Sequence, residues 1–452
     1  MSQRFKKILL LGGDIAVLYV SLWLTLLIRY QALPESERWL QHFWPFTIVY
    51  FIWLVVFYIN GLYSITTTRN DFKFFTSLFQ AMLANASLGA VFFYLTPFVS
   101  ISPKTNFVIS LVLGFALVAL WRQLFNIFIG AKGRRMKTLL IGESSQIDEL
   151  TSFLDNHPQL GYKVAKTISP TEVLNNSDFD LKKLIEQHQI KVVAAENIAL
   201  RSQTMVDQLF KIIPLKLKVL DLANFAEEVS GKIPISSIGQ VWFLENLNLS
   251  SQNSYEIAKR VFDIITSILL LILLSWLIPL IALAIWLNMG SPVIFKQKRT
   301  GLLGQPFLAM KFRSMVKEAE KSGPQWAQKN DPRVTRLGSI LRKTRLDEIP
   351  QLLNIIRGEM SFVGPRPERP VFVETLRQKI PFYNERHLVK PGLTGWAQIS
   401  FPYGASEADA LEKLQYDLYY IKNRSLIFDL AIILKTIKTV LSLEGSEATD
   451  KK

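Results

Sequence analysis

The sequence contains no cysteine. A disulfide, a thiolate metal site, an iron–sulfur cluster and a cysteine nucleophile are therefore all excluded. Histidine is scarce and scattered, with only His42, His157, His188 and His387, so a histidine-rich zinc site is not expected. Glycine (22) and proline (20) are ordinary in number for 452 residues, which excludes collagen-like and low-complexity architectures.

Charged residues are also few, at 20% against 49% hydrophobic residues, which is the opposite of a disordered chain. Among them, 52 Lys and Arg outnumber 37 Asp and Glu, so the net charge is +15. A basic balance suits nucleic acid, anionic lipid or a phosphorylated substrate. The many apolar segments argue against a soluble nucleic-acid-binding protein, and no nucleic-acid partner is expected. The length is enough for about three domains of roughly 100–200 residues.

Four apolar segments, residues 8–28, 43–59, 74–99 and 107–128, approach or exceed the roughly 20 residues that cross a bilayer. They predict a four-helix transmembrane bundle over residues 1–130. Basic residues flank both ends of this bundle: Arg4, Lys6 and Lys7 before it, and Lys132, Arg134, Arg135 and Lys137 after it. Because the intervening outer loops are less basic, we expect both ends of the bundle in the cytoplasm.

One acidic residue, Asp14, lies inside the first predicted membrane helix. An intramembrane acidic residue is a candidate for function. Asp14 lies only two turns into the helix, after Gly12 and Gly13, where a polar helix-packing role fits equally well. Both interpretations stay open, and no chemistry is assigned to Asp14.

Residues 131–250 show short apolar runs that alternate with polar helical stretches. The expected strands are residues 137–141, 162–168, 190–195 and 217–222, and their spacing predicts a Rossmann-like domain with a parallel sheet. The turn Gly142-Glu-Ser-Ser145 lacks the second and third glycines of a dinucleotide-binding loop. We therefore expect a structural or regulatory domain. Tyr255 and Lys259 match the Tyr-x-x-x-Lys pair of reductases, but outside this domain, and we attribute the match to chance.

A fifth apolar segment, residues 264–287, contains no charged residue. Basic residues flank it, with Lys259 and Arg260 before it and Lys296 and Lys298 after it, which favours a cytoplasmic location for both ends. Pro279 interrupts the segment and should kink a helix there. The segment therefore predicts a re-entrant membrane helix. A plain fifth span with a tolerated proline is the alternative.

Residues 255–452 contain the motifs that suggest chemistry. Alternating residues predict two strands that carry Lys296, Lys298, Lys311 and Arg313. Further on, Asp347 and Glu348 lie among basic residues, directly before a predicted helix over residues 350–357. A carboxylate pair in a cationic field suits Mg²⁺ or a carboxylate that attacks phosphorus. On spacing alone, a helix N-terminus with surface salt bridges is the more common explanation.

Seven stretches of this region, in order, resemble the bacterial sugar transferases that prime polysaccharide synthesis, the polyisoprenyl-phosphate hexose-1-phosphate transferases. They are Lys259-Arg-Val-Phe-Asp263, residues 292–301, Lys311-Phe-Arg-Ser-Met315, residues 331–338, residues 341–351, Gly364-Pro-Arg-Pro-Glu368 and residues 391–398. Residues 1–250 resemble the N-terminal part of the large family members, and residues 401–422 resemble the branch that acts on glucose or galactose. Small members have Ser-Pro at the break of the membrane helix, where this chain has Ile278-Pro279.

The resemblance implies a reaction at the bacterial inner membrane. Hexose 1-phosphate passes from a UDP-hexose (glucose or galactose) to undecaprenyl phosphate on the cytoplasmic face, and UMP is released. This step initiates exopolysaccharide, capsule or O-antigen synthesis. The resemblance also implies a homodimer embedded in inner-membrane lipids.

The same resemblance implies roles for individual residues. Asp347 is the expected nucleophile, which forms a covalent phosphosugar intermediate, and Glu348, together with Asp347, is the expected Mg²⁺ ligand. Arg366 is expected to hold phosphate. The other expected phosphate and nucleotide ligands are Lys311, Arg313, Arg342 and Arg345.

Two other functions compete with this interpretation. A non-catalytic membrane scaffold for polysaccharide assembly would leave the charge pair merely structural, but Asp347, Glu348 and Arg366 are all intact. A membrane-anchored nucleotide-sugar dehydratase built on the α/β domain would need the glycines that residues 142–145 lack. The sequence does not reveal which hexose is used.

Overall fold

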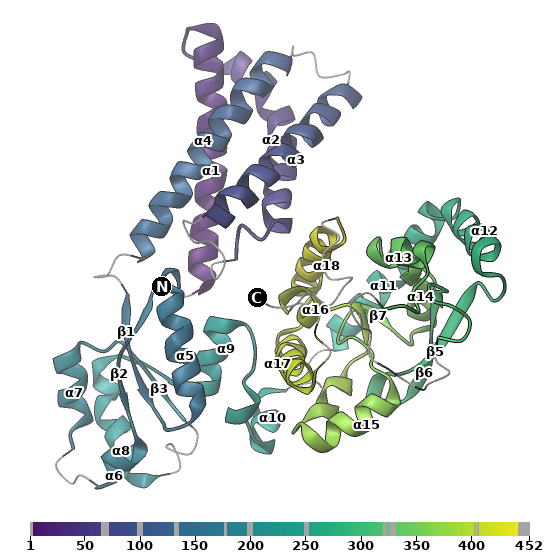
Figure 1. Cartoon of the computed structure of the whole chain (residues 1–452). Helices are drawn as coiled ribbons and strands as arrows, with labels where there is room; N and C mark the ends of the chain where they lie inside the picture. Colours follow the sequence, from purple (N-terminus) through teal and green to yellow (C-terminus); the bar gives the residue numbers. More distant parts are fainter. Residues whose placement is uncertain are drawn as a thin grey trace. The chain divides into compact units, whose positions relative to one another are not determined.

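The computed structural model of the chain describes residues 3–64, 72–96, 103–130, 135–175, 179–196, 202–247, 253–319, 323, 325, 331–401, 404 and 406–441. It divides into two compact units, Met1–Ser230 and Gly231–Lys452, whose elements are labelled in Figure 1. The first unit contains the helical bundle and the α/β domain. Residues 231–247, including α10 (Gln240–Asn246), belong to the second unit. The division into three domains at residues 130 and 250 stays a prediction.

The four predicted membrane helices are present in the first unit. They are α1 (Gln3–Tyr30), α2 (Ser36–Ile59), α3 (Phe72–Leu95) and α4 (Pro103–Gly130). Each is long and apolar enough to cross a membrane. Lys132 and Arg134, on which part of the expected orientation depends, lie outside the described residues.

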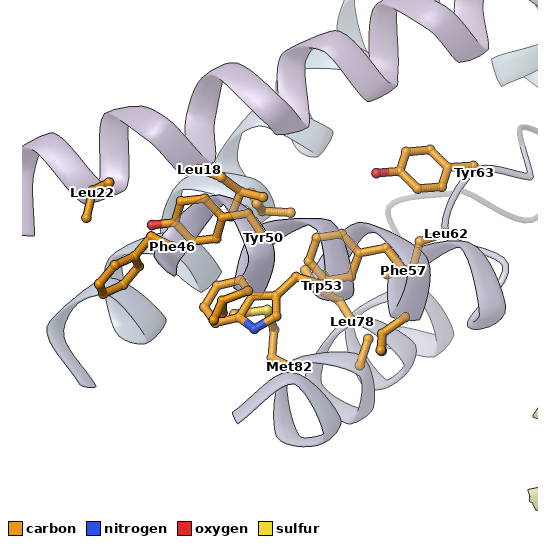
Figure 2. Close-up of a cluster of buried hydrophobic side chains, with 14 of the residues drawn as sticks. Leu18, Leu22, Phe46, Tyr50, Trp53, Phe57, Leu62, Tyr63, Leu78 and Met82 are labelled. Atoms are coloured by element: carbon orange, nitrogen blue, oxygen red, sulfur yellow. The ribbon is translucent and has the colours of Figure 1, made fainter. Parts of the chain in front are cut away.

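The core of the bundle is largely aromatic and aliphatic. Side chains from α1, α2 and α3, among them Leu18, Trp53 and Leu78, are fully buried there (Figure 2). Polar bridges join the helices as well: the Tyr50 hydroxyl lies 2.7 Å from the Ser110 hydroxyl of α4. Such hydrogen bonds help to hold membrane helices together, since lipid offers no competing polar partner.

Asp14 forms a buried ion pair with Arg122, a residue of another membrane helix. Arg122 of α4 donates a hydrogen bond from Nη2 to Asp14 Oδ2 and another from Nη1 to the Leu62 carbonyl, and both charged side chains are almost fully buried. The neighbouring residue Gly13 leaves room for the ring of Trp121, which a Cβ atom would overlap. Residues 13–14 of α1 therefore fit residues 121–122 of α4, which is the helix-packing role.

The α/β domain follows with a four-stranded parallel sheet of order β2-β1-β3-β4. Its strands are β1 (Met136–Ile141), β2 (Tyr162–Ile168), β3 (Val192–Ala195) and β4 (Lys218–Asp221). The helices are α5 (Ser145–Asn156), α6 (Pro170–Asn175), α7 (Leu181–His188), α8 (Gln203–Ile212) and α9 (Leu222–Ser230). The predicted Rossmann-like domain with a parallel sheet is confirmed, and two hydrophobic cores lie on the sheet's opposite faces.

A bent pair of helices opens the rest of the second unit. Helix α11 (Asn253–Leu273) and helix α12 (Leu277–Met289) meet at 67° across a break at residues 274–276. Pro279 lies in the first turn of α12. Because its nitrogen has no hydrogen to donate to the carbonyl of Ser275, the helix is interrupted just before the proline. Leu269, Leu273 and Leu287 are among the many apolar side chains that the pair exposes, as expected for a lipid-facing surface.

The remaining elements build the α/β fold of the second unit. The strands are β5 (Ile294–Thr300), β6 (Pro306–Phe312), β7 (Ser361–Val363) and β8 (Gly392–Thr394). The helices are α13 (Arg336–Lys343), α14 (Gln351–Arg357), α15 (Pro370–Lys379), α16 (Trp396–Ser400), α17 (Glu407–Asn423) and α18 (Leu426–Leu441). Strands β5 and β6 pair antiparallel and β7 and β8 pair parallel.

We predict that Asp14→Ala destabilises the bundle by about 3–5 kcal/mol, because it leaves the Arg122 guanidinium buried without its carboxylate. Thermal unfolding of the detergent-solubilised protein measures this effect. The double variant Asp14→Ala/Arg122→Met should be more stable than Asp14→Ala alone, and Asp155→Ala, at an exposed site on α5, is the control. Equal stability of Asp14→Ala and the parent would contradict the packing role.

Candidate active site

Strand β6 and helix α14 provide the frame of the site. The buried side chain of Asn354 joins them: its Oδ1 accepts from the Met310 backbone N–H at 3.0 Å, and its Nδ2 donates to the Leu308 carbonyl at 2.8 Å. An amide side chain inside a helix thus completes hydrogen bonds at the edge of a strand. This contact fixes the position of Lys311, one residue beyond Met310, relative to the chain that leads into α14.

Asp347 and Glu348 lie in a 3₁₀ turn, Leu346–Glu348, between α13 and α14. Arg345 precedes the turn with a left-handed backbone (φ 59°), an uncommon conformation that reverses the chain there. Pro350 is the N-cap of α14, so the predicted helix over residues 350–357 is confirmed. Both carboxylates are buried, which removes the explanation of a solvated helix N-terminus with surface salt bridges.

Glu348 is surrounded by positive charge. Its Oε1 accepts hydrogen bonds from Lys311 Nζ at 2.7 Å and from Arg366 Nη2 at 3.1 Å, and Arg345 Nη1 lies 4.0 Å away. The Arg366 side chain is 36% exposed against 9% for Glu348. The Arg366 guanidinium and the Lys311 ammonium group are therefore accessible to a ligand, while the Glu348 carboxylate lies deeper in the cluster.

The two carboxyls differ in their electrostatic environment. Burial acts to raise the pKa of Glu348, but the charges of Lys311, Arg366 and Arg345 outweigh burial and hold that pKa well below its ordinary value. Burial raises the pKa of Asp347, and the Glu348 charge adds to this shift, while Lys311 opposes it. Neighbouring acids whose pKa values are driven apart are typical of a division of chemical roles. Asp347 Oδ1 is buried and accepts no hydrogen bond from any residue that the structure describes.

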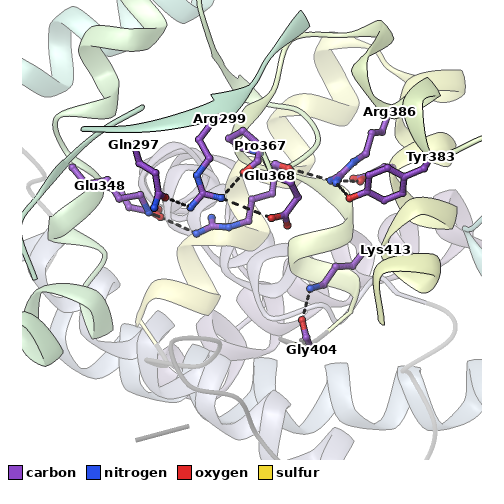
Figure 3. A network of polar contacts seen from close by, with 12 residues as sticks. Gln297, Arg299, Glu348, Pro367, Glu368, Tyr383, Arg386, Gly404 and Lys413 are labelled. Atoms are coloured by element: carbon purple, nitrogen blue, oxygen red, sulfur yellow. Dashed lines mark hydrogen bonds and ion pairs between the residues drawn. The ribbon is translucent and has the colours of Figure 1, made fainter. Parts of the chain in front are cut away.

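The segment that carries Arg366 is held from both sides (Figure 3). Arg299 of β5 donates to the Pro367 carbonyl at 3.0 Å, and Arg386 donates to the Arg366 carbonyl at 3.1 Å. Arg386 also forms a buried ion pair with Asp417 at 2.8 Å, where burial raises the pKa of Asp417 to about 6. The role of Arg386 is therefore to position Arg366.

Two motif glycines allow this segment to approach β8. A Cβ atom on Gly364 would lie 2.3 Å from the Lys390 carbonyl oxygen, and one on Gly392 would lie 2.1 Å from the Gly364 nitrogen. These are backbone contacts that no side-chain movement can relieve. The glycines of Gly364-Pro-Arg-Pro and Pro391-Gly-Leu-Thr are thus required by close backbone packing beside Arg366.

The other predicted phosphate ligands occupy different places. Arg342 donates from Nε to the Ser314 hydroxyl at 2.9 Å, and its charge opposes the rise in the pKa of Asp347. Arg313 points elsewhere: its Nη2 donates to the carbonyls of Met289 and Gly290 at the end of α12. Arg313 therefore caps the bent membrane helix, and its role toward phosphate stays a prediction, as do those of Arg342, Arg345 and Arg366.

Sequence reasoning gave no role to Arg386, Asp417 or Arg299. Arg386 lies in no recognised motif, and Asp417, 31 residues further along the chain, lies within residues 401–422, so no local signal could have paired them. Arg299 and Glu368 both fall in recognised stretches, and their side chains lie 3.8 Å apart. The signal in the sequence for this contact was that Arg299 and Glu368 each lie in a stretch that resembles the family.

The residues present fit a bound Mg²⁺. This ion takes one or two protein carboxylates and fills its other positions with water and substrate phosphates. Within the described ranges no group of three or more acidic, His or Cys side chains could hold a metal. The two carboxylates that would hold the ion are those of Asp347 and Glu348. The unpartnered Asp347 Oδ1 is the kind of hard oxygen that the ion prefers.

The place where a Rossmann-like domain would bind a nucleotide is filled by Glu196. This residue follows β3, and its carboxylate accepts from the backbone N–H groups of Glu143 at 3.2 Å and Ser144 at 3.1 Å, at the start of α5. In such sheets ligands bind beyond the carboxyl ends of the strands where the order reverses, here between β1 and β3. A carboxylate of the chain itself occupies the anion position, which disfavours the dehydratase interpretation.

Known proteins resemble this chain over part of its length. A transferase of Aeromonas hydrophila, UDP-N-acetylgalactosamine-undecaprenyl-phosphate N-acetylgalactosaminephosphotransferase, is 40% identical over 232 residues, which are 51% of this chain and 54% of that protein. The UDP-glucose:undecaprenyl-phosphate glucose-1-phosphate transferase of Escherichia coli is 38% identical over 302 residues, 62% of each chain. The chain thus spans little more than half the length of these two relatives.

A shorter relative is covered more fully. The UDP-glucose:undecaprenyl-phosphate glucose-1-phosphate transferase of Caulobacter vibrioides is 41% identical over 195 residues, which are 42% of this chain and 72% of that protein. The family model of the bacterial sugar transferases matches residues 254–443, which run from α11 into the end of the described chain and include Asp347, Glu348 and Arg366. With this match, and with 41% identity over 72% of the Caulobacter vibrioides transferase, the chain belongs to the bacterial sugar transferase family.

Proposed function

We propose that this protein transfers hexose 1-phosphate from a UDP-hexose to undecaprenyl phosphate, releases UMP, and so initiates the synthesis of a surface polysaccharide. The observation that supports this most directly is the buried Asp347, with an unpartnered oxygen, beside a Glu348 that three cations surround. The names of the relatives from Aeromonas hydrophila, Escherichia coli and Caulobacter vibrioides, which all include undecaprenyl phosphate, support the acceptor. A homodimer remains a prediction.

In the proposed first step, an Asp347 carboxylate oxygen attacks the phosphorus that bears the sugar. The bond from that phosphorus to the bridging oxygen breaks, and UMP leaves with the oxygen. An oxygen of undecaprenyl phosphate then attacks the same phosphorus, and Asp347 leaves as a carboxylate. Arg366 and Lys311 face the phosphoryl oxygens, where their fixed charges stabilise the charge of the transition state.

Glu348 serves to orient Lys311 and Arg366 and, with Asp347, would hold Mg²⁺. A bound Mg²⁺ would neutralise part of the diphosphate charge. Because the pKa of Glu348 is held low, Glu348 stays ionised near neutral pH and keeps its hydrogen bonds. Asp347 needs to be ionised to attack, and its raised pKa makes it the stronger nucleophile once it has lost its proton.

We further propose that α11 and α12 enter and leave the membrane on its cytoplasmic side. UDP-sugars are made in the cytoplasm, and the bundle of four helices returns the chain to the side on which it started. The sharp bend and the exposed apolar faces support a helix pair that dips into one leaflet. A scaffold without catalysis is the second candidate, and UMP release separates the two.

Asp347→Asn should lower the rate of UMP release by on the order of a thousandfold or more, because an amide is a very poor nucleophile. The assay mixes purified protein, undecaprenyl phosphate and either UDP-glucose, UDP-galactose or UDP-N-acetylgalactosamine, which also identifies the sugar. Glu374→Gln, at an exposed position on α15, is the control and should keep the parent rate. Parent-like activity of Asp347→Asn would refute the assignment, and an inactive parent with every sugar would favour the scaffold.

Lys311→Gln should move the acidic limb of the pH–rate profile to higher pH. Lys311 lowers the pKa of Asp347, so its neutralisation raises that pKa further, and a higher pH is needed to ionise the nucleophile. Rates of UMP release measured between about pH 5 and 9 show the shift, with Lys379→Gln as the exposed control. A lower rate with an unmoved acidic limb would mean that Lys311 does not act through Asp347.

Pro279→Ala should allow some molecules to span the membrane fully and lose activity, since a continuous helix without the proline gains up to about 3 kcal/mol. Because the chain has no native cysteine, a single Lys379→Cys on exposed α15 reports the location of the second unit. In the parent background, an impermeant thiol reagent should not label it in intact cells. Labelling there would disprove the re-entrant arrangement. If Pro279→Ala stays shielded and active, the proline is not the cause of the bend.

A further inference from the structure

A pocket lies at the opposite end of α14 from Asp347 and Glu348. It encloses about 330 Å³, including its open mouth, and its charged lining comes from Glu256, Lys259, Arg260, Asp263, Lys390 and Arg424. Helix α14 has seven residues, so the pocket and the carboxylate pair are separated by about 10 Å or more along the helix.

Most charges around the pocket have partners of their own. Lys259 Nζ pairs with Asp429 at 2.6 Å, and Arg424 pairs with Glu256. Arg260 donates to the carbonyls of Ile355 and Ile356 at the end of α14. These contacts also account for the Tyr255 and Lys259 pair of the sequence, because the Tyr255 hydroxyl donates to the same Asp429 carboxylate at 2.8 Å.

Lys390 differs from the other cations that line the pocket. Within the described part of the chain, its ammonium group makes no hydrogen bond and has no carboxylate within ion-pair distance. Partial burial and the like charge of Arg260 lower the pKa of Lys390, Asp263 and Glu256 act in the opposite sense, and Lys259 adds a smaller lowering. Asp263 accepts from the Phe362 backbone N–H at 3.1 Å. The pocket therefore has an excess of positive charge that one anion would balance.

The position of the pocket on α11 indicates the source of that anion. Lys259 and Arg260 lie four to five residues before the apolar stretch that begins at Ile264, which is about 6–8 Å along a helix. Lipid headgroups occupy a layer of about 5–8 Å on each side of the hydrocarbon core. A helix that dips into the membrane from Ile264 onward therefore places the pocket at headgroup depth, where anionic lipids are concentrated on the cytoplasmic face.

We propose that this pocket binds the phosphate group of an anionic membrane lipid, one without a compensating headgroup cation, with Lys390 as its main ligand, at a site separate from Asp347 and Glu348. Such a lipid would fasten the start of the bent helix pair to α14 and β8. The inference does not depend on the proposed transfer reaction, since it concerns binding alone.

The test measures the reactivity of Lys390 in the full-length protein. The protein is placed in phosphatidylcholine nanodiscs with a rising fraction of phosphatidylglycerol, treated with an amine-acetylating reagent, and analysed by peptide mass spectrometry. We expect acetylation of Lys390 to slow about tenfold as phosphatidylglycerol rises, a change that matches a charged hydrogen bond, while the exposed Lys379 does not follow. An unchanged rate at Lys390 overturns the proposal.

Two further arms identify the source of the phosphate and the residue. Inorganic phosphate added to pure phosphatidylcholine discs should not protect Lys390, and equal protection would overturn the lipid source in favour of free phosphate. Phosphatidylglycerol should raise the melting temperature of the parent and of Lys390→Arg but not of Lys390→Gln. An equal rise in the melting temperature of Lys390→Gln would overturn the role of Lys390. If Lys390→Gln does not fold, the acetylation of Lys390 in the parent protein is the deciding measurement.

Discussion

The second unit is organised around one constraint, the burial of an ionised Glu348. A carboxylate away from water needs compensating charge, and Lys311 and Arg366 provide it through direct hydrogen bonds. Each of these cations is itself positioned by other contacts, Lys311 through β6 and Asn354, and Arg366 through the clamp of Arg299 and Arg386. The close backbone packing of Gly364 against Gly392 follows from the same need, because it brings the Arg366 segment next to the turn that carries Glu348.

The membrane helix pair is coupled to this cluster through the backbone. Arg313 follows β6 and caps the carbonyls at the end of α12, while Lys311, two residues earlier, donates to Glu348. At the other end of the pair, Arg260 of α11 caps α14, which begins just after the carboxylates. The bent helices and the cluster around Glu348 therefore share contacts with β6 and α14.

The sequence predicted regular elements well where local patterns decide them. The strand over residues 162–168 has the predicted bounds, because a short apolar run begins just after a glycine there. Pro279 indicated the kink, although the break lies at residues 274–276, since a proline affects the carbonyl four residues before it. Long-range pairs were harder to predict. Asp14 and Arg122 are 108 residues apart, and only their shared status as charges within apolar segments hinted at the pair. The contact of Glu196 with the loop after β1, and the clamp formed by Arg386, depend on tertiary packing that no local pattern encodes.

The most direct test of the central claim is the mass of the protein after it meets its donor alone. Purified protein is incubated with the UDP-sugar it uses, without undecaprenyl phosphate, then quenched, and its peptides are analysed by mass spectrometry. The account predicts a hexose phosphate attached to Asp347, formed together with about one UMP per active site. An adduct on another residue, or continued UMP release with no adduct at all, would contradict it.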